Sequence, residues 1–150
     1  MKTIARYSVV LGALAIFTTT AVAADDPIKA RQELMKSVVK ATKLSGQMVK
    51  GEIPFDSSAA SNAMQTIAGV PDKYVTLFPV GSEKGGETEA SPKIWEDMAG
   101  FKAEAEKLKM SAMKGVEAAG KGADEFKAAF GELVKSCKSC HQDYRIKKQK

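Results

Sequence analysis

CKSCHQDYR, residues 137–145, contains both cysteines and the only histidine of this 150-residue chain. Its first five residues form a C-x-x-C-H run, the pattern of covalent haem attachment, in which two thiols bond to the haem vinyl groups and the imidazole binds the iron. On a helix, at about 100° per residue, Cys140 lies roughly 60° to one side of Cys137 and His141 roughly 40° to the other. The three side chains therefore share one face, which can hold one macrocycle.

The two cysteines and the histidine could also serve chemistry other than haem attachment. A C-x-x-C pair also serves as a redox disulfide, but that motif usually opens a helix after a strand, whereas here it lies deep in a helical pattern. A structural zinc site needs about four Cys or His ligands, and this chain has three in all. A Ser/His/Asp hydrolytic set would need the same single histidine. The motif predicts one covalently bound haem c in a protein that is not an enzyme, and a haem-free thiol-disulfide protein using Cys137 and Cys140 stays as an alternative.

Residues 1–23 have the features of a signal peptide that is cleaved. Lys2 and Arg6 make a basic start, residues 7–17 form an apolar core, and a small-residue cleavage site follows. The apolar core is too short to span a bilayer, which argues against a retained anchor and against stable membrane insertion. We expect residues 24–150 to form one exported domain in the periplasm, an oxidising compartment.

Length and charge limit the partners. About 126 residues remain after cleavage, enough for one domain with a single core. Loss of the two cations of the signal peptide takes the count from 23 basic and 18 acidic residues to 21 and 18, a net charge of +3. This small excess predicts neither nucleic-acid nor membrane binding.

Helical spacing of apolar residues predicts the first half of the fold. Pro27 at a first turn opens an amphipathic run that continues to about Val49. Residues 56–58 offer N-caps to a second helix, which a Gly-Val-Pro sequence at 69–71 interrupts. Residues 80–90 contain three glycines and have no periodicity, which predicts a surface loop.

Two further helices complete the prediction. Ser91 and Pro92 start a third helix, which glycines 115, 120 and 122 end, and a fourth runs from near Asp124 through Tyr144. Apolar residues in both recur at alternating intervals of four and three, the seam of a bundle helix. The chain is therefore expected to be all-α, an antiparallel four-helix bundle with the haem motif on the buried stripe of its last helix.

The chain resembles the cytochrome c prime family, the class II cytochromes c, over its whole mature length. The position of the motif on the last helix of a bundle is more specific than the motif itself. The resemblance implies a left-handed antiparallel four-helix bundle with one covalent haem c, and often a homodimer packed through the first two helices. Besides CKSCHQDYR, the matching pieces are RQELM (31–35), KGEIPFD (50–56), LFP (77–79) and SPKIW (91–95).

The resemblance also implies roles for single residues. Cys137 and Cys140 match the thioether positions and His141 matches the proximal iron ligand. Four further positions match residues around the haem: Arg31 and Gln32 approach a propionate, Met35 faces the iron on the distal side, and Arg145 is the basic residue beside the proximal histidine.

Met35 separates the two functions that a haem protein of this kind could have. If its thioether binds the iron opposite His141, the haem is low-spin, and His/Met ligation suits an electron carrier. If Met35 only packs, as methionine often does in cores, the iron is five-coordinate and open to nitric oxide or carbon monoxide. Electron transfer in the low-spin His/Met branch, with an unidentified redox partner, is the main hypothesis from sequence, and gas binding is its alternative.

Overall fold

The computed structural model describes residues 26–146, and its regular elements are helices throughout that range. The predicted signal peptide, residues 1–23, and the basic residues after 146 lie outside this part of the chain. Within it, the only pairing of strand type is an isolated antiparallel bridge between Ala90 and Arg145. The helices are α1 (Pro27–Val49), α2 (Ser57–Ala68), α3 (Pro71–Tyr74), α4 (Lys93–Glu96), α5 (Met98–Ala119) and α6 (Ala123–Tyr144).

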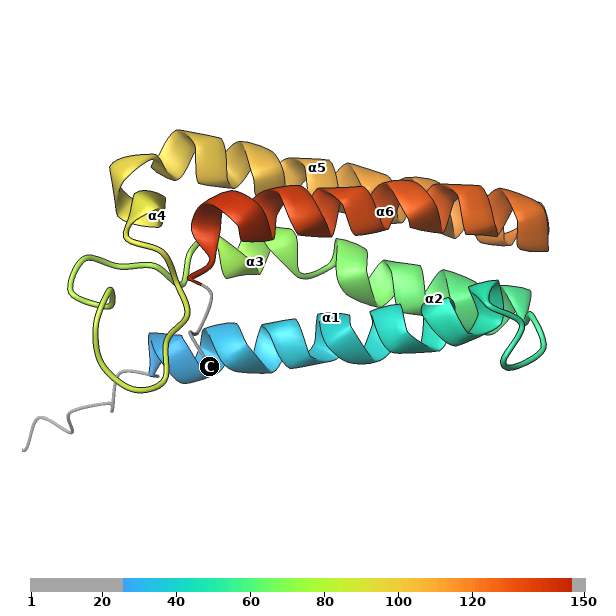
Figure 1. Ribbon diagram of the computed structural model, residues 1–150, viewed down its shortest axis with the longest axis horizontal. Coiled ribbons are helices and arrows are strands. Elements are labelled where there is room, and N and C mark those ends of the chain that lie inside the picture. Colours follow the sequence, from blue (N-terminus) through green and yellow to red (C-terminus); the bar gives the residue numbers. More distant parts are fainter. Residues whose placement is uncertain (1–25, 147–150) are drawn as a thin grey trace, which may run out of the picture.

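Four of these helices form an antiparallel bundle, which confirms the predicted fold class (Figure 1). α5 packs most extensively against α6 and α2, and α1 packs mainly against α2, so α1 and α6 touch far less than the other neighbours. The long connection between α3 and α4 lies at the end of the bundle where α1 begins and α6 finishes. The weak contact between α1 and α6 leaves room along this side.

Local sequence signals account for the starts of α1 and α2. The carboxylate of Asp26 accepts hydrogen bonds from the backbone amides of Ile28 and Lys29 at 2.9 and 3.3 Å, and Pro27 follows as the first helical residue. Asp56 caps α2 in the same way, accepting from the amide of Ala59 at 2.6 Å. Each cap satisfies backbone donors that the first helical turn leaves without partners.

The third helix differs from the prediction, because it is broken at Asp97. A short α4 follows Pro92, and Asp97 then takes a non-helical conformation, with φ −133° and ψ 61°, and caps α5 instead. One carboxylate oxygen accepts from the amide of Gly100 at 2.9 Å, and the other accepts from the hydroxyl of Tyr144 at 2.8 Å. These hydrogen bonds to the Asp97 side chain favour the start of a new helix over continuation of α4. The bond from Tyr144 links this break to α6.

Asp97 makes the free energy of unfolding depend on pH in the acidic range. The Gly100 amide, and after it the Tyr144 hydroxyl, lowers the pKa of Asp97 below its ordinary value of 3.8. Because the folded pKa is the lower one, ionised Asp97 stabilises the fold above the unfolded pKa, and this stabilisation is lost as pH falls through the folded pKa.

We expect Asp97→Asn to flatten the fall in the free energy of unfolding between about pH 5 and pH 2, measured by urea denaturation. The control is Asp124→Asn, an exposed aspartate in the first turn of α6, which should keep the wild-type slope. Parallel curves for wild type and Asp97→Asn would contradict the assignment.

The sequence predicts that Gly115 helps to end the third helix, but α5 continues through it to Ala119. Gly115 is buried, and a Cβ placed on it would lie 2.7 Å from the sulfur and 2.8 Å from Cγ of Met64 on α2. The glycine therefore permits close approach of two helices, and the end of α5 falls at Gly120.

The core consists of two hydrophobic clusters. The first joins α1, α2, α5 and α6, and half-buried Cys137 packs against it. The second lies at the loop end of the bundle, where half-buried Cys140 packs against it, and its buried members are Phe78, Ile94, Phe101 and Tyr144. The two cysteines of the motif thus reach different clusters, three residues apart on α6.

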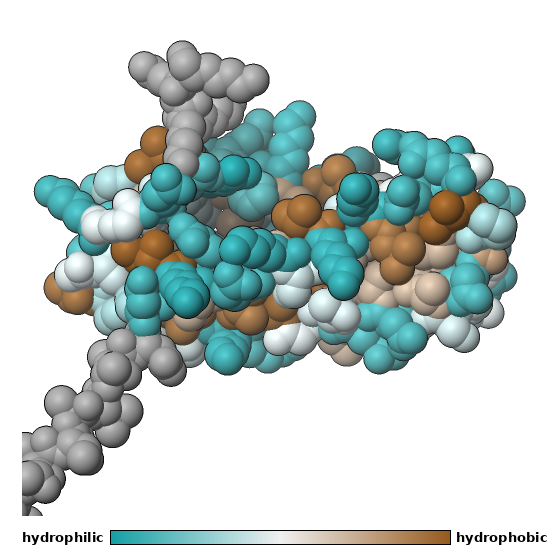
Figure 2. Space-filling model, turned by 90° about the horizontal axis from the view of Figure 1, so that it is seen from below, coloured by the Kyte–Doolittle hydropathy of each residue, from teal (hydrophilic) through white to brown (hydrophobic). Residues whose placement is uncertain are grey.

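The helices of residues 26–146 and one face of the surface bear on membrane insertion and on dimerisation. None of the helices between residues 26 and 146 is long and apolar enough to cross a bilayer. On the face seen in Figure 2, hydrophobic side chains form separate groups between hydrophilic ones. The homodimer expected from the resemblance therefore stays a prediction.

Candidate haem site

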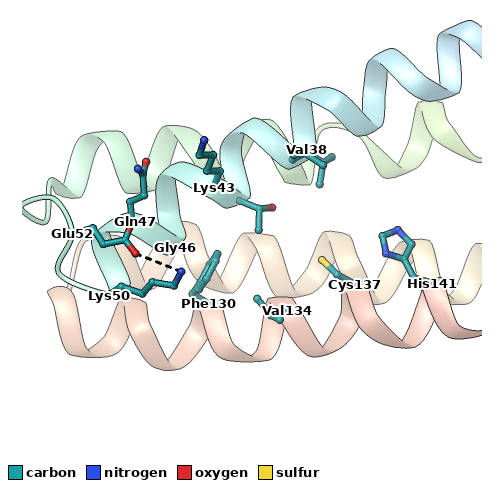
Figure 3. A pocket seen from close by; sticks show the side chains of 12 residues that line it. Val38, Lys43, Gly46, Gln47, Lys50, Glu52, Phe130, Val134, Cys137 and His141 are labelled. Carbon is teal, nitrogen blue, oxygen red and sulfur yellow. Dashed lines mark ion pairs between the residues drawn. The ribbon is translucent and has the colours of Figure 1, made fainter. Parts of the chain in front are cut away.

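A groove with a volume of about 550 Å³ runs between α1 and α6, within the size range of small-molecule sites (Figure 3). Its α6 wall is one helical stripe at intervals of four, three and four residues, and these side chains point toward α1. Its other wall is formed by α1 and the turn after it. The lining residues are Phe130, Val134, Cys137 and His141 from α6, with Val38, Val39, Thr42, Lys43, Gly46, Gln47, Lys50 and Glu52 opposite.

The register of the two walls places Met35 level with His141. A Cβ on Gly46 would lie 3.9 Å from the ring of Phe130, so these two positions face each other. Met35 is eleven residues before Gly46 and His141 is eleven residues after Phe130, and antiparallel helices rise equally, about 1.5 Å per residue. Met35 is half-buried against the first core cluster, and it does not line the groove.

The two cysteines are free thiols in a setting that makes thiolate chemistry unfavourable. Burial raises the pKa of Cys137, and burial followed by the charge of Glu104 raises the pKa of Cys140 to about 11. Cysteines that exchange disulfides have lowered pKa values, because the thiolate is the reactive form. The haem-free thiol-disulfide alternative is therefore disfavoured by the surroundings of these residues.

His141 lies at the exposed edge of the groove with an imidazole suited to binding metal. Partial removal from water lowers its pKa, and the nearby cation of Arg145 lowers it further. Neutral imidazole has the lone pair that a metal ligand needs. In residues 26–146 no group of three or more His, Cys, Asp or Glu side chains could hold a metal ion, so His141 has no partner set for a zinc site.

Arg31 has surroundings that suit the binding of a carboxylate group. It is 4% exposed, and burial lowers its pKa. Its Nε donates to the carbonyl of Pro27 at 3.1 Å and its Nη2 to that of Ser82 at 2.8 Å, but its buried Nη1 has no partner. A guanidinium with one unmet donor suits a haem propionate, since charge-assisted pairs are the strongest hydrogen bonds.

Gln32 and Arg145 make contacts with the connection between α3 and α4. The amide nitrogen of Gln32 donates to the backbone carbonyl of Glu87 at 2.8 Å, which ties this segment to α1. Nε of Arg145 donates to the carboxylate of Glu89 at 2.6 Å. Neither residue lines the groove, so their predicted haem contacts stay predictions.

Sequence reasoning missed two features of the site. The guanidinium of Arg31 lies over the ring of Phe78, 4.4 Å from its centroid, and 5.7 Å from that of Trp95. Glu104 is buried on α5. The apolar spacing of α5 could have revealed it, because Glu104 lies three residues after Phe101 on the buried stripe, a position where carboxylates are rare.

Comparison with known proteins gives consistent results. The sequence profile of the family described as Cytochrome C' matches residues 26–145. The chain is 39% identical to a cytochrome c' of Rhodopseudomonas palustris, over 95% of this chain and 97% of that protein. It is 35% identical to a cytochrome c-556 of Agrobacterium fabrum, over 85% of this chain and 86% of that protein.

Solved structures agree with the sequence matches. A cytochrome c' of Rhodopseudomonas palustris superposes with a TM-score of 0.80 and 38% identity, covering 84% of this chain and all of that one. A nitric oxide complex of a variant of cytochrome c prime from Alcaligenes xylosoxidans superposes with a TM-score of 0.73 and 30% identity, covering 82% and 96%. Since the profile spans all six helices and a relative matches along almost its full length, the chain belongs to the cytochrome c' family, and its cofactor is a covalently attached haem c.

Proposed function

We propose that this cytochrome c' binds small uncharged gases, such as nitric oxide or carbon monoxide, at an iron held by His141 alone. The observation that carries the proposal is the position of Met35. It reaches the level of His141, and its half-buried side chain packs against the first core cluster. The proposal therefore treats Met35 as a packing residue, in contrast to the main hypothesis from sequence.

The haem would supply an iron that can bind a gas and a one-electron couple. The chain's own residues hold and enclose it. Cys137 and Cys140 anchor the ring covalently, His141 binds the iron, and the free donor of Arg31 pairs with a propionate. These assignments are parts of the proposal.

The α1 wall suits a gas better than a charged ligand. Val38 is buried, and Val39 and Thr42 continue the lining toward Gly46, so no charged group faces the part of the groove next to Cys137 and His141 from α1. The cations of Lys43 and Lys50 lie farther along, and Lys50 pairs with Glu52 at 3.5 Å. The polarity of the distal pocket decides what a haem binds, and an apolar wall offers an anion nothing to replace its water. A structural relative with bound nitric oxide supports the same function.

Substitution of Met35 by leucine tests the proposal. Leucine keeps the volume, at a cost below about 1.5 kcal/mol, and cannot bind iron. We expect the ferric and ferrous optical spectra, and the shift on adding carbon monoxide, to be the same as in wild type. Met98→Leu, another half-buried methionine, is the matched control.

The opposite result would restore electron transfer as the function. It would consist of sharp low-spin bands and no carbon monoxide complex in wild type, turning high-spin only in Met35→Leu. Export to the periplasm and dimerisation are further expectations that this experiment does not address, and they accompany either function.

A further inference from the structure

Glu104 is a buried carboxylate that the proposed gas site does not use. The residue is 9% exposed, and one oxygen, Oε1, accepts from Nζ of Lys107 at 2.6 Å. The other oxygen, Oε2, is buried without a hydrogen-bond partner, and in residues 26–146 it shares this status only with Nη1 of Arg31. Burying a carboxylate oxygen without a hydrogen-bond partner costs free energy, which makes Glu104 a candidate for a role beyond packing.

The register of α5 and α6 places Glu104 beside the haem anchor. The hydroxyls of Ser111 and Ser136 are 3.0 Å apart, and the rings of Phe101 and Tyr144 are 5.3 Å apart, which aligns the two antiparallel helices. Glu104 lies three residues after Phe101, and Cys140 lies four residues before Tyr144. The carboxylate is therefore level with the thiol of Cys140, whose pKa it also raises.

The charge of Glu104 is only partly compensated. The side chain of Lys107 is 65% exposed, whereas that of Glu104 is 11% exposed. An exposed ammonium is screened by water and salt, but a buried charge acts through a medium of lower dielectric constant. A net negative field therefore reaches the interior at Cys140.

We propose that Glu104 lowers the reduction potential of the haem attached at Cys140. Reduction of the haem adds one electron and converts iron(III) to iron(II) without transfer of an atom. A nearby negative charge favours the more positive oxidised state, and the field around a haem is one of the levers that set its potential. Glu104 acts through this field as a tuning residue and contacts neither the iron nor its ligand in this proposal.

Glu104→Gln, which keeps the shape and removes the charge, is expected to raise the midpoint potential measured by spectroelectrochemical titration with dithionite and ferricyanide. The matched control is Glu106→Gln, two residues along the same helix and exposed. It should shift the potential much less. The shift from Glu104→Gln should persist in about 1 M salt, where interactions between exposed charges are screened.

Lys107→Gln gives a second test that does not depend on tolerance of a change at Glu104. Removal of the exposed cation leaves the carboxylate uncompensated, so the midpoint potential should fall, opposite in sign to the first variant. The control is Lys114→Gln, which changes an exposed lysine seven residues farther along α5 and should leave the midpoint potential unchanged.

Two results would overturn the proposal. One is an unchanged potential in folded, haem-loaded Glu104→Gln, and this outcome would give Glu104 a structural role visible only in the free energy of unfolding. The other is a pair of shifts in the same direction for Glu104→Gln and Lys107→Gln. Neither result bears on gas binding, because the spectra with carbon monoxide are measured separately.

Discussion

A chain in which both Cys137 and Cys140 are replaced by serine is expected to carry no covalently bound haem. The thioether bonds need a sulfur at each position, and residues 26–146 contain no other cysteine. Haem staining after denaturing electrophoresis, together with the intact mass, should change from a haem-bearing chain to a bare one. The effect is complete loss, since no other side chain on this face can form the bond.

Ser139→Ala is the matched control, because it changes one of the two residues between the cysteines and keeps both sulfurs. It should retain the haem stain and the haem mass. Covalent haem in the double serine variant would refute the assignment. A wild-type chain without haem but with two titratable thiols would instead support the thiol-disulfide alternative, against the family to which the chain belongs.

Gly115→Ala is expected to destabilise the fold, although helix propensity alone favours alanine. In a helix interior, alanine is better than glycine by about 0.5–1 kcal/mol. Here the added Cβ would overlap with the side chain of Met64, which is fully buried and has little space into which it can move. Overpacking of this kind costs about 1–3 kcal/mol, so steric overlap should outweigh the gain in propensity.

Gly131→Ala on α6 is the control that separates these two effects. A Cβ on Gly131 would meet nothing within 4 Å, and the residue is exposed. Urea denaturation should therefore show that Gly131→Ala stabilises by about 0.5–1 kcal/mol while Gly115→Ala destabilises by about 1–2 kcal/mol.

A double-mutant cycle with Met64→Ala tests the mechanism. Once the overlapping atoms of Met64 are removed, Gly115→Ala should no longer destabilise, which gives a favourable coupling between the two changes. Equal effects of Gly115→Ala in both backgrounds would mean that α2 and α5 do not meet closely at this point.

The proposed haem-binding face follows from local spacing alone. Cys137, Cys140 and His141 lie within five residues, and the geometry of one helix decides which way their side chains point. The level of Met35 relative to His141 could not be obtained in this way. It depends on how α1 is aligned against α6, which a contact such as that between Gly46 and Phe130 decides.

Local sequence was enough to predict the covalent haem, the number of long helices and the N-cap of α2 within residues 56–58, because motifs, periodicity and capping act over a few neighbouring residues. The tertiary structure decided the break at Asp97, which shares a hydrogen bond with Tyr144 across 47 residues. It also decided the burial of Glu104 and of the Arg31 guanidinium. Those outcomes depend on which helix faces which and at what register, and that alignment is set by packing of the whole core.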